Sequence, residues 1–242
     1  MKRVLMLLLC MLTVPFLIIS CTKEAENEQS QLLTGVFAKE KIAFDDKFQK
    51  SGSAILEGNT LYFVGSMTMD DGSNSSTLAV LNTENMNISY ETLPQGEYNG
   101  LAVSEDKYLL METSFNDQTF QNEYVLHEVS GESAVWTKSA SEIITLPDNY
   151  WGGIYIASAD GKWCIGAGTS FALVTSGGTV EKTETLPAEI SGLKKDTDGR
   201  LHVWGRGFHK IMDENGSLSD AESLKAGVGN LYFTKDYDYC YT

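Results

Sequence analysis

One short motif constrains the fold of this chain more than any other feature of its sequence. The tripeptide Thr-Leu-Pro occurs at residues 92–94, 145–147 and 185–187, and these copies contain every proline after Pro15. A glycine follows each of these prolines after five or six residues, and then come a strand-like run, a tight turn and a second strand-like run. Three copies of this order of signals predict an internal repeat. The glycines are Gly100, Gly153 and Gly192.

The turns inside the repeat predict β-hairpins. Asp-Gly between alternating apolar runs is the strongest local hairpin signal, because a two-residue turn of the primed type needs positive φ angles. The turns recur every 38–55 residues, a period typical of propeller blades. Sustained helical periodicity is absent, and the segments are rich in Tyr, Val, Ile and Thr, which favour strands. The predicted turns are 57–59, 105–107, 160–162, 198–200 and 235–237.

We therefore predict an all-β fold over residues 32–242, a β-propeller of four-stranded antiparallel blades with about four blades and an unfinished fifth. Val36–Phe44 would suit a strand that closes the ring. The chain ends in the first hairpin of the fifth unit, and natural proteins seldom leave such an edge unpaired. The sequence thus favours a propeller that is incomplete at the C-terminus over a very small propeller with an unusual closure. In the fourth repeat the expected strands are Leu193–Lys195, Leu201–Trp204, His209–Asp213 and Ala221–Leu224, with a turn at Asn215-Gly216.

Two longer runs resemble known propeller families. The run GLKKDTDGRLHVWGRGFHKIMDENGSL, which ends at Leu218, resembles a blade of the bacterial periplasmic sensor propellers of the two-component-regulator type. The opening VFAKEKIAFDDKFQ, with GNTLYFVGS further on, is similar to the N-terminal propeller region of some clostridial solute-binding lipoproteins. Both resemblances imply a propeller that works outside the cell.

The N-terminus predicts export. Lys2 and Arg3 precede an apolar run over residues 4–19, and Ser20 stands before Cys21. This order is typical of a cleaved signal peptide over residues 1–20. Ile-Ile-Ser-Cys at 18–21 resembles the lipobox of bacterial lipoproteins, which implies that Cys21 is diacylated, with palmitate-type chains, and becomes the first residue. An ordinary cleaved signal or an uncleaved anchor is the alternative.

Residues 21–31 predict a flexible tether between the lipid and the folded domain. The stretch TKEAENEQSQ has three glutamates and no apolar residue beyond Ala25, so it cannot bury enough surface to offset the entropy of ordering it. The expected location is the cell envelope, on the extracytoplasmic side of the membrane.

The charge excludes some partners. The formal net charge is −15, and cleavage of the signal peptide would also remove the two positive charges of Lys2 and Arg3. Such an acidic chain repels phosphate backbones, so we expect no nucleic-acid partner. It also repels anionic headgroups, so the lipid chains would have to hold the protein at the membrane unaided. Apart from Cys21, the mature chain would contain two cysteines, Cys164 and Cys240, and the sequence leaves open whether they form a disulfide.

Catalytic and cofactor motifs are absent from the sequence. His127-Glu128 has no second histidine one helical turn later, and Gly166-Ala167-Gly168 lacks the third glycine of a dinucleotide loop. Asp196–Gly199 begins like a calcium loop but lacks the later ligands, which favours a hairpin turn. We expect no metal, no cofactor and no enzymatic activity. His202 falls at a repeat position where other units have Cys164 or Leu109, which predicts packing between blades.

One end of the predicted propeller carries candidate binding residues. The links between blades and the turns between second and third strands should meet there, including Asp70-Asp71, 114–116, Thr169-Ser170 and Glu189–Ser191. Aromatic rings beside amides and carboxylates suit sugars or peptides, and a lone arginine could hold a carboxylate. The alternative is that the rings pack between blades and the acids are solvated. The candidate ligand-binding residues are Tyr98, Asn99, Asp148, Asn149, Tyr150, Trp151, Arg206 and His209.

The sequence therefore predicts a lipid-anchored extracytoplasmic propeller that binds a small molecule, glycan or peptide, as part of a solute-binding or sensing lipoprotein. One alternative is a scaffold that docks a partner protein. Another is a glycan-cleaving enzyme, which would need paired carboxylates such as Asp70 and Asp148 about 5–10 Å apart.

Overall fold

The computed structural model describes residues 42–196, 198–221, 231–232 and 240–241. The chain divides into two units, residues 1–43 and 44–242, and all described strands belong to the second. The predicted signal peptide, Cys21 and the tether lie outside the described residues, as does all of the expected closing strand except 42–44, which are not in a strand. Within the described part of the chain, no helix is long and apolar enough to cross a bilayer.

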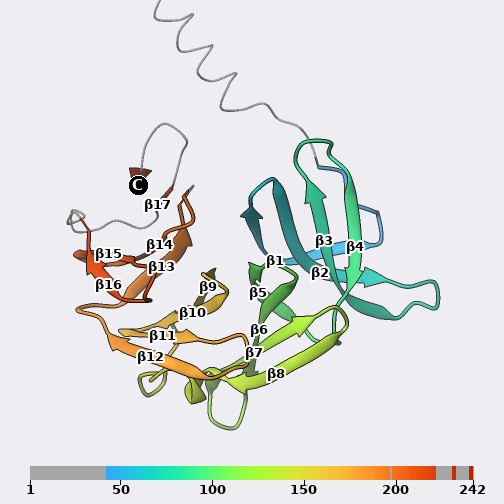
Figure 1. Cartoon of the computed structure of the whole chain (residues 1–242). Coiled ribbons are helices and arrows are strands. Elements are labelled where there is room, and N and C mark those ends of the chain that lie inside the picture. Colours follow the sequence, from blue (N-terminus) through green and yellow to red (C-terminus); the bar gives the residue numbers. More distant parts are fainter. Residues whose placement is uncertain (1–41, 197, 222–230, 233–239, 242) are drawn as a thin grey trace, which may run out of the picture. The chain divides into compact units, whose positions relative to one another are not determined.

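Four sheets of four antiparallel strands follow one another along the chain, each with its strands paired in sequence order (Figure 1). The first sheet is β1 (Phe48–Glu57), β2 (Thr60–Thr68), β3 (Asn74–Asn82) and β4 (Ile88–Thr92). The second is β5 (Tyr98–Ser104), β6 (Lys107–Asn116), β7 (Gln121–Ser130) and β8 (Ser133–Ser139), followed by the short 3-10 helix η1 (Ala140–Glu142).

The third sheet is β9 (Tyr155–Ala159), β10 (Lys162–Ala167), β11 (Ser170–Val174) and β12 (Val180–Thr185). The fourth is β13 (Ile190–Lys195), β14 (Leu201–Gly205), β15 (Phe208–Met212) and β16 (Leu218–Asp220). A separate pair, β17 (Leu231–Tyr232) and β18 (Cys240–Tyr241), is also antiparallel. The predicted all-β fold of four-stranded propeller blades is thus confirmed.

The hairpin turns lie where the sequence predicts them. In each of the four sheets, one of the predicted turns joins the first strand to the second. These turns are 57–59, 105–107, 160–162 and 198–200. Gly58, Gly161 and Gly199 have φ angles of 56°, 71° and 84°, and Glu105 takes the same role at 52°. Asp196 accepts hydrogen bonds from the backbone N–H of Asp198 and Arg200, which makes this segment a turn, as predicted. The fifth predicted turn, 235–237, lies outside the described residues.

The fourth strand of the fourth blade is where the prediction was wrong. It spans Leu218–Asp220 and so begins three residues before the predicted start at Ala221, which is not in a strand; the rest of the predicted range, 222–224, lies outside the described residues. Asp213 accepts hydrogen bonds from the N–H of Asn215 and Ser217, and Gly216 has a φ of 73°. The chain therefore reverses within the turn itself, and Leu218 pairs at once with Met212.

The first strands of the four sheets lie next to one another in sequence order. Strand β5 contacts both β1 and β9, and β13 contacts β9. Figure 1 shows these four strands on the inner sides of their sheets. The ammonium of Lys195, at the end of β13, forms an ion pair with Glu57, at the end of β1, so the fourth sheet also reaches the first.

Close packing on these inner strands explains two of the three recurring glycines, Gly100 and Gly192, whereas Gly153 lies in the link before β9. Both β5 and β13 have a bulge just before the glycine, between Tyr98 and Gly100 and between Ile190 and Gly192. A Cβ on Gly192 would overlap the ring of Trp204, and a Cβ on Gly100 would lie 2.8 Å from the Cε of Met111. Only glycine allows the side chain of the second strand to pass over the first strand at this position.

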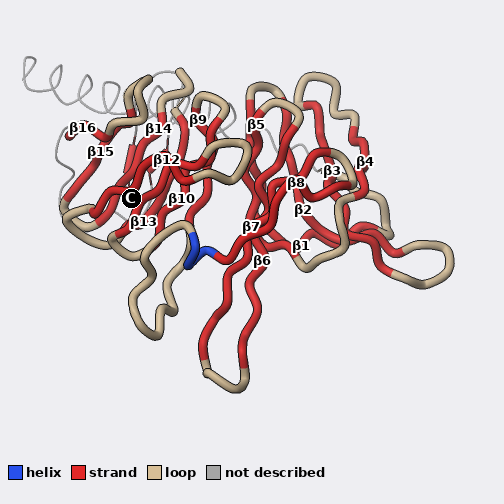
Figure 2. The backbone as a smooth tube through the Cα atoms, turned by 60° about the horizontal axis from the view of Figure 1, so that its bottom comes forward, coloured by secondary structure: helices blue, strands red, loops and turns tan. Residues whose placement is uncertain are grey.

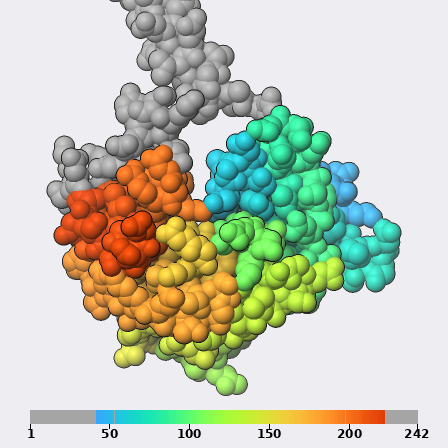
Figure 3. Space-filling model, in the orientation of Figure 1, coloured from blue at the N-terminus to red at the C-terminus, as the bar shows by residue number. Residues whose placement is uncertain are grey.

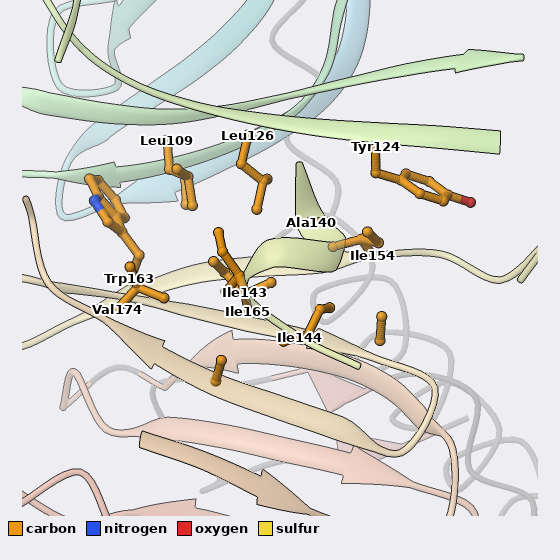
Figure 4. Close-up of a cluster of buried hydrophobic side chains, with 13 residues drawn as sticks. Leu109, Tyr124, Leu126, Ala140, Ile143, Ile144, Ile154, Trp163, Ile165 and Val174 are labelled. Carbon is orange, nitrogen blue, oxygen red and sulfur yellow. The ribbon is translucent and has the colours of Figure 1, made fainter. Parts of the chain in front are cut away.

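Apolar cores fill the spaces between successive sheets. Strand β10 shows how: alternation sends Trp163, Ile165 and Ala167 toward the second sheet and Cys164 toward the fourth. Figure 4 shows Leu109 and Leu126 of the second sheet pointing toward Ile165 and toward Ile143, which follows η1. In the space-filling view, atoms of the second and third sheets are in direct contact (Figure 3). Cys164 is a fully buried free thiol.

Candidate functional site

The links between sheets and the turns between second and third strands meet at one end, as predicted. The N–H groups of Leu186 and Ile190, which flank the β12–β13 link, donate to the carbonyls of Thr169 and Gly168 in the β10–β11 turn. Figure 2 shows the β6–β7 hairpin and the β8–β9 link, with η1 in blue, projecting from the same end. Chain segments that are distant in sequence therefore share one surface.

This end contains an open cleft of about 490 Å³. Such a volume lies within the range of small-ligand pockets, about 300–1,000 Å³. Four of the eight candidate residues line it, Asp148 to Trp151, together with the predicted Glu189–Ser191 segment. Both segments belong to links that the sequence assigns to this end. The lining residues are Pro147, Asp148, Asn149, Tyr150, Trp151, Gly152, Gly153, Tyr155, Glu189, Ile190 and Ser191.

The tyrosine of the β8–β9 link fixes the shape of the cleft. The hydroxyl of Tyr150 donates to the carbonyl of Gly153, 2.8 Å away, and accepts from the N–H of Gly168 at 3.0 Å. It therefore joins this link to the β10–β11 turn. Burial raises the pKa of the Tyr150 phenol above its usual value of 10, so it stays protonated and able to donate at neutral pH.

Asn149 holds the tip of the same link. Its φ is 56°, a left-handed conformation that asparagine adopts more readily than most residues. Its side-chain oxygen accepts a hydrogen bond of 2.8 Å from the amide of Gln121, the first residue of β7. The link is thereby tied to the β6–β7 hairpin of the second sheet.

Three exposed aromatic rings stand beside the cleft, and we call them the aromatic patch: Phe115, Phe120 and Trp151. They are 49%, 69% and 60% exposed. The ring of Phe115 lies 6.0 Å from that of Trp151 and 6.4 Å from that of Phe120. Because Trp151 also lines the cleft, the patch and the cleft form one continuous surface.

Phe115 is among the residues that the sequence assigns to this end, but Phe120 is not. The signal was present in the sequence, since two phenylalanines flank a polar hairpin tip, Asn116 to Thr119. Phe120 has a φ of 55°, which is costly for an aromatic residue. Backbone strain of this kind clusters at functional sites.

The cleft is acidic. Its lining includes the carboxylates of Asp148 and Glu189, both exposed, and among the described residues that line it there is no Lys, Arg or His. Arg206, the expected cation of this end, is exposed in the β14–β15 turn but is not one of the lining residues. The cleft therefore presents oxygen acceptors and ring faces.

The remaining candidates lie elsewhere. Tyr98 is 3% exposed, and its hydroxyl donates to the carbonyl of Pro94, so it belongs to the core and not to the surface. Tyr98 is the first residue of β5 and does not belong to the link before it, so its ring points into the core. Asn99 is exposed and accepts a hydrogen bond from Thr113 on the neighbouring strand. His209, on β15, is 2% exposed and does not line the cleft.

His209 is part of a buried polar chain on the fourth sheet. Its Nε2 lies 2.7 Å from Nδ1 of His202, and Nε2 of His202 lies 3.0 Å from a carboxylate oxygen of Asp196. Burial and the neighbouring His202 lower the pKa of His209 to about 4. Burial opposes ionisation of Asp196, but hydrogen bonds from His202 and Arg200 outweigh it and lower the pKa of that carboxyl. The packing role predicted for His202 agrees with its 1% exposure.

No group of three or more His, Cys, Asp or Glu residues in the described ranges has a geometry that could hold a metal ion. Asp70, on the β2–β3 turn, forms an ion pair of 2.6 Å with Lys47. It does not line the cleft that contains Asp148.

No protein-family model matches the chain, and no curated protein matches it. Solved structures with a similar arrangement include BamB from Moraxella catarrhalis, at 12% identity and a TM-score of 0.37, covering 65% of this chain and 41% of that one. The β-propeller domain of the Trilobed protease from Pyrococcus furiosus has 12% identity and a TM-score of 0.42, and the match covers 78% of this chain and 60% of that one. The extracellular domain of BT4673 from B. thetaiotaomicron has 13% identity and a TM-score of 0.42, and the match covers 84% of this chain and 27% of that one. The chain thus spans less than two thirds of each of these proteins.

Proposed function

We propose that the protein is a lipid-anchored extracytoplasmic propeller that binds a ligand in the cleft between the β8–β9 and β12–β13 links. The observation that carries the proposal is the continuity of this cleft with the aromatic patch. Exposed aromatic rings beside polar acceptors bind ligands that have both apolar faces and polar groups, such as peptides and sugars. Tyr150 and Asn149 preorganise the link, which lowers the entropic cost of binding.

The binding experiment is a thermal-shift titration of the mature protein, purified in detergent, with a panel of short peptides and oligosaccharides. A ligand of the cleft should raise the melting temperature of the protein but not of the Trp151→Ala variant. Replacement of Arg206 by Ala is the matched control, because Arg206 is exposed at the same end but does not line the cleft. If no member of the panel shifts the melting temperature, the ligand-binding function is wrong.

The anchor is proposed from the sequence of residues 1–21. Replacement of Cys21 by Ser removes the thiol that a lipid would modify, so the protein should lose labelling by radioactive palmitate and leave the membrane fraction. Retention of both in the Cys21→Ser variant would rule out lipidation at this residue. Two acyl chains are enough for stable anchoring without a basic patch.

The exposed aromatic patch also favours a second candidate, the docking of a partner protein. Exposed apolar surfaces that are continuous often mark interaction sites. Recovery of one stoichiometric partner from solubilised membranes, lost in Phe115→Ala, together with no small-molecule binding, would favour docking over ligand binding.

A further inference from the structure

Charge and ring geometry at the cleft narrow the class of ligand. A neutral sugar can be bound by hydrogen-bond donors and acceptors whether the surrounding side chains are anionic, cationic or neutral. The residues that line this cleft supply two carboxylates and no cationic side chain. Ring faces attract cations through their quadrupole, most strongly for the indole of tryptophan. Carboxylates and exposed aromatic rings therefore favour the same kind of group, a cation with a flat or apolar body.

From this we infer that the cleft binds a short peptide through an arginine side chain, which stacks on Trp151 and Phe115 and pairs with Asp148 or Glu189. The inference rests on the proposed ligand-binding function and names the class of ligand. Guanidinium is planar, stacks on aromatic faces and forms bidentate pairs with carboxylates, whereas the ammonium of lysine is compact and strongly hydrated. The cleft volume of about 490 Å³ limits the bound part to a few residues.

The carboxylates and the indole ring line the same cleft. Asp148 and Trp151 are on the same link, three residues apart, and both line the cleft, as does Glu189 on the opposite link. Phe115 extends the indole surface toward the β6–β7 hairpin, with its ring tilted by 37° relative to that of Trp151. The side-chain amide of Gln121 donates a hydrogen bond to Asn149, so the β6–β7 hairpin and the β8–β9 link are held together before a ligand binds.

The general acidity of the chain makes a control essential, since any cationic peptide is attracted to a protein with a net charge of −15. Two acids at the other ends of the strands provide it. Asp106 is in the β5–β6 turn and Glu132 in the β7–β8 turn, and both are exposed. The Asp106→Asn, Glu132→Gln pair removes the same charge as Asp148→Asn, Glu189→Gln but leaves the cleft intact.

The test is an NMR titration at about 0.15 M salt, where charges beyond about 8 Å are largely screened. The probe is the capped peptide Ac-Gly-Arg-Gly-Arg-Gly-amide, and its matched control has citrulline, a neutral isostere, in place of both arginines. The indole N–H signal of Trp151, assigned by its loss in Trp151→Phe, reports on the cleft. The buried indoles of Trp163 and Trp204 serve as internal references.

We expect the arginine peptide to shift the Trp151 signal and the citrulline peptide to bind at least about tenfold more weakly, a difference of about 1.4 kcal/mol. The Asp148→Asn, Glu189→Gln variant should lose about tenfold in affinity, and the Asp106→Asn, Glu132→Gln variant less than about twofold. Equal binding of both peptides, or an equal loss in both double variants, would overturn the inference.

Neutral oligosaccharides such as xylotriose form a separate arm of the titration. If they shift the Trp151 signal and the arginine peptide does not, the peptide inference fails while the proposed ligand-binding function stands. If no ligand shifts the Trp151 signal or the melting temperature, both are overturned.

Discussion

The carboxylate of Glu128 accepts a hydrogen bond of 2.5 Å from the indole N–H of Trp163, across the boundary between the second and third sheets. The same oxygen accepts a second bond, of 2.9 Å, from the indole of Trp136. The other oxygen lies 3.4 Å from the ammonium of Lys107. Glu128 is completely buried, so these partners replace the water that a carboxylate normally requires. One acidic side chain therefore joins two blades.

Replacement of Glu128 by Gln should lower the free energy of unfolding by about 2 kcal/mol or more. Glutamine keeps one acceptor oxygen, but its amide N–H₂ must face an indole N–H or the Lys107 ammonium, and a buried donor then loses its acceptor. Urea denaturation followed by tryptophan fluorescence measures the change. Glu132→Gln, on an exposed turn at the end of the same strand, is the control and should change stability by less than about 0.5 kcal/mol. Equal stability of the two variants would contradict the bridging role of Glu128.

Gly205→Ala should destabilise the protein by about 1–3 kcal/mol and also weaken ligand binding. A Cβ at this position would overlap the backbone carbonyl of Glu189, which lines the cleft, and the ring of Phe208. Relief of the overlap must move the β12–β13 link. Gly177→Ala is the control, because its nearest neighbour would be the Oγ1 of Thr175 at 3.7 Å and its φ is not in the left-handed region. Thermal unfolding measures the first effect, and the peptide titration measures the second. An unchanged melting temperature would show that the link can shift freely.

The blades were predictable because their signals are local. Asp160-Gly161 and Asp198-Gly199 determine their turns within a few residues, and alternation of apolar residues then places each strand face. The four cleft residues Asp148 to Trp151 were predictable for a similar reason, since they are consecutive and lie on one link.

Features that depend on distant pairs were not predictable. Glu128 meets Trp163 from 35 residues away, and Phe115 meets Trp151 from 36 residues away, so no local pattern indicates either contact. Tyr98 was assigned to a link because it follows Thr-Leu-Pro, but the bulge before Gly100 starts the strand earlier and turns the ring into the core. A shift of one residue in register decides which face a side chain occupies.

Asn149→Ala should lower stability by about 1 kcal/mol and reduce binding in the cleft, whereas Asn149→Gly should recover part of both losses. Alanine is strained at a φ of 56° and cannot accept the hydrogen bond from Gln121. Glycine removes the strain but not the lost bond. The unfolding free energy and the NMR signal of the Trp151 indole, two residues away, report on the two effects. If glycine were no better than alanine, the backbone conformation would not be what asparagine supplies here.

The free energy of unfolding should fall as the pH is lowered from about 6.5 to about 4, in part because of His209. The folded protein keeps this imidazole neutral down to its pKa of about 4, while the unfolded chain binds a proton near pH 6.5. Over this interval the unfolded state binds more protons, so stability rises with pH there and is lost as the pH falls. The contribution of His209 is at most about 3 kcal/mol, at 1.36 kcal/mol per pKa unit. His209→Gln, which retains a donor toward His202, should have a shallower dependence of stability on pH between 4 and 6.5. The pKa of Asp196 is lowered from its usual value of 3.8, so the stability that its ionised form contributes is lost only at pH values below 3.8, outside this interval. An identical slope in the variant and the wild-type protein, measured by urea denaturation at half-unit pH steps, would show that His209 does not carry this dependence.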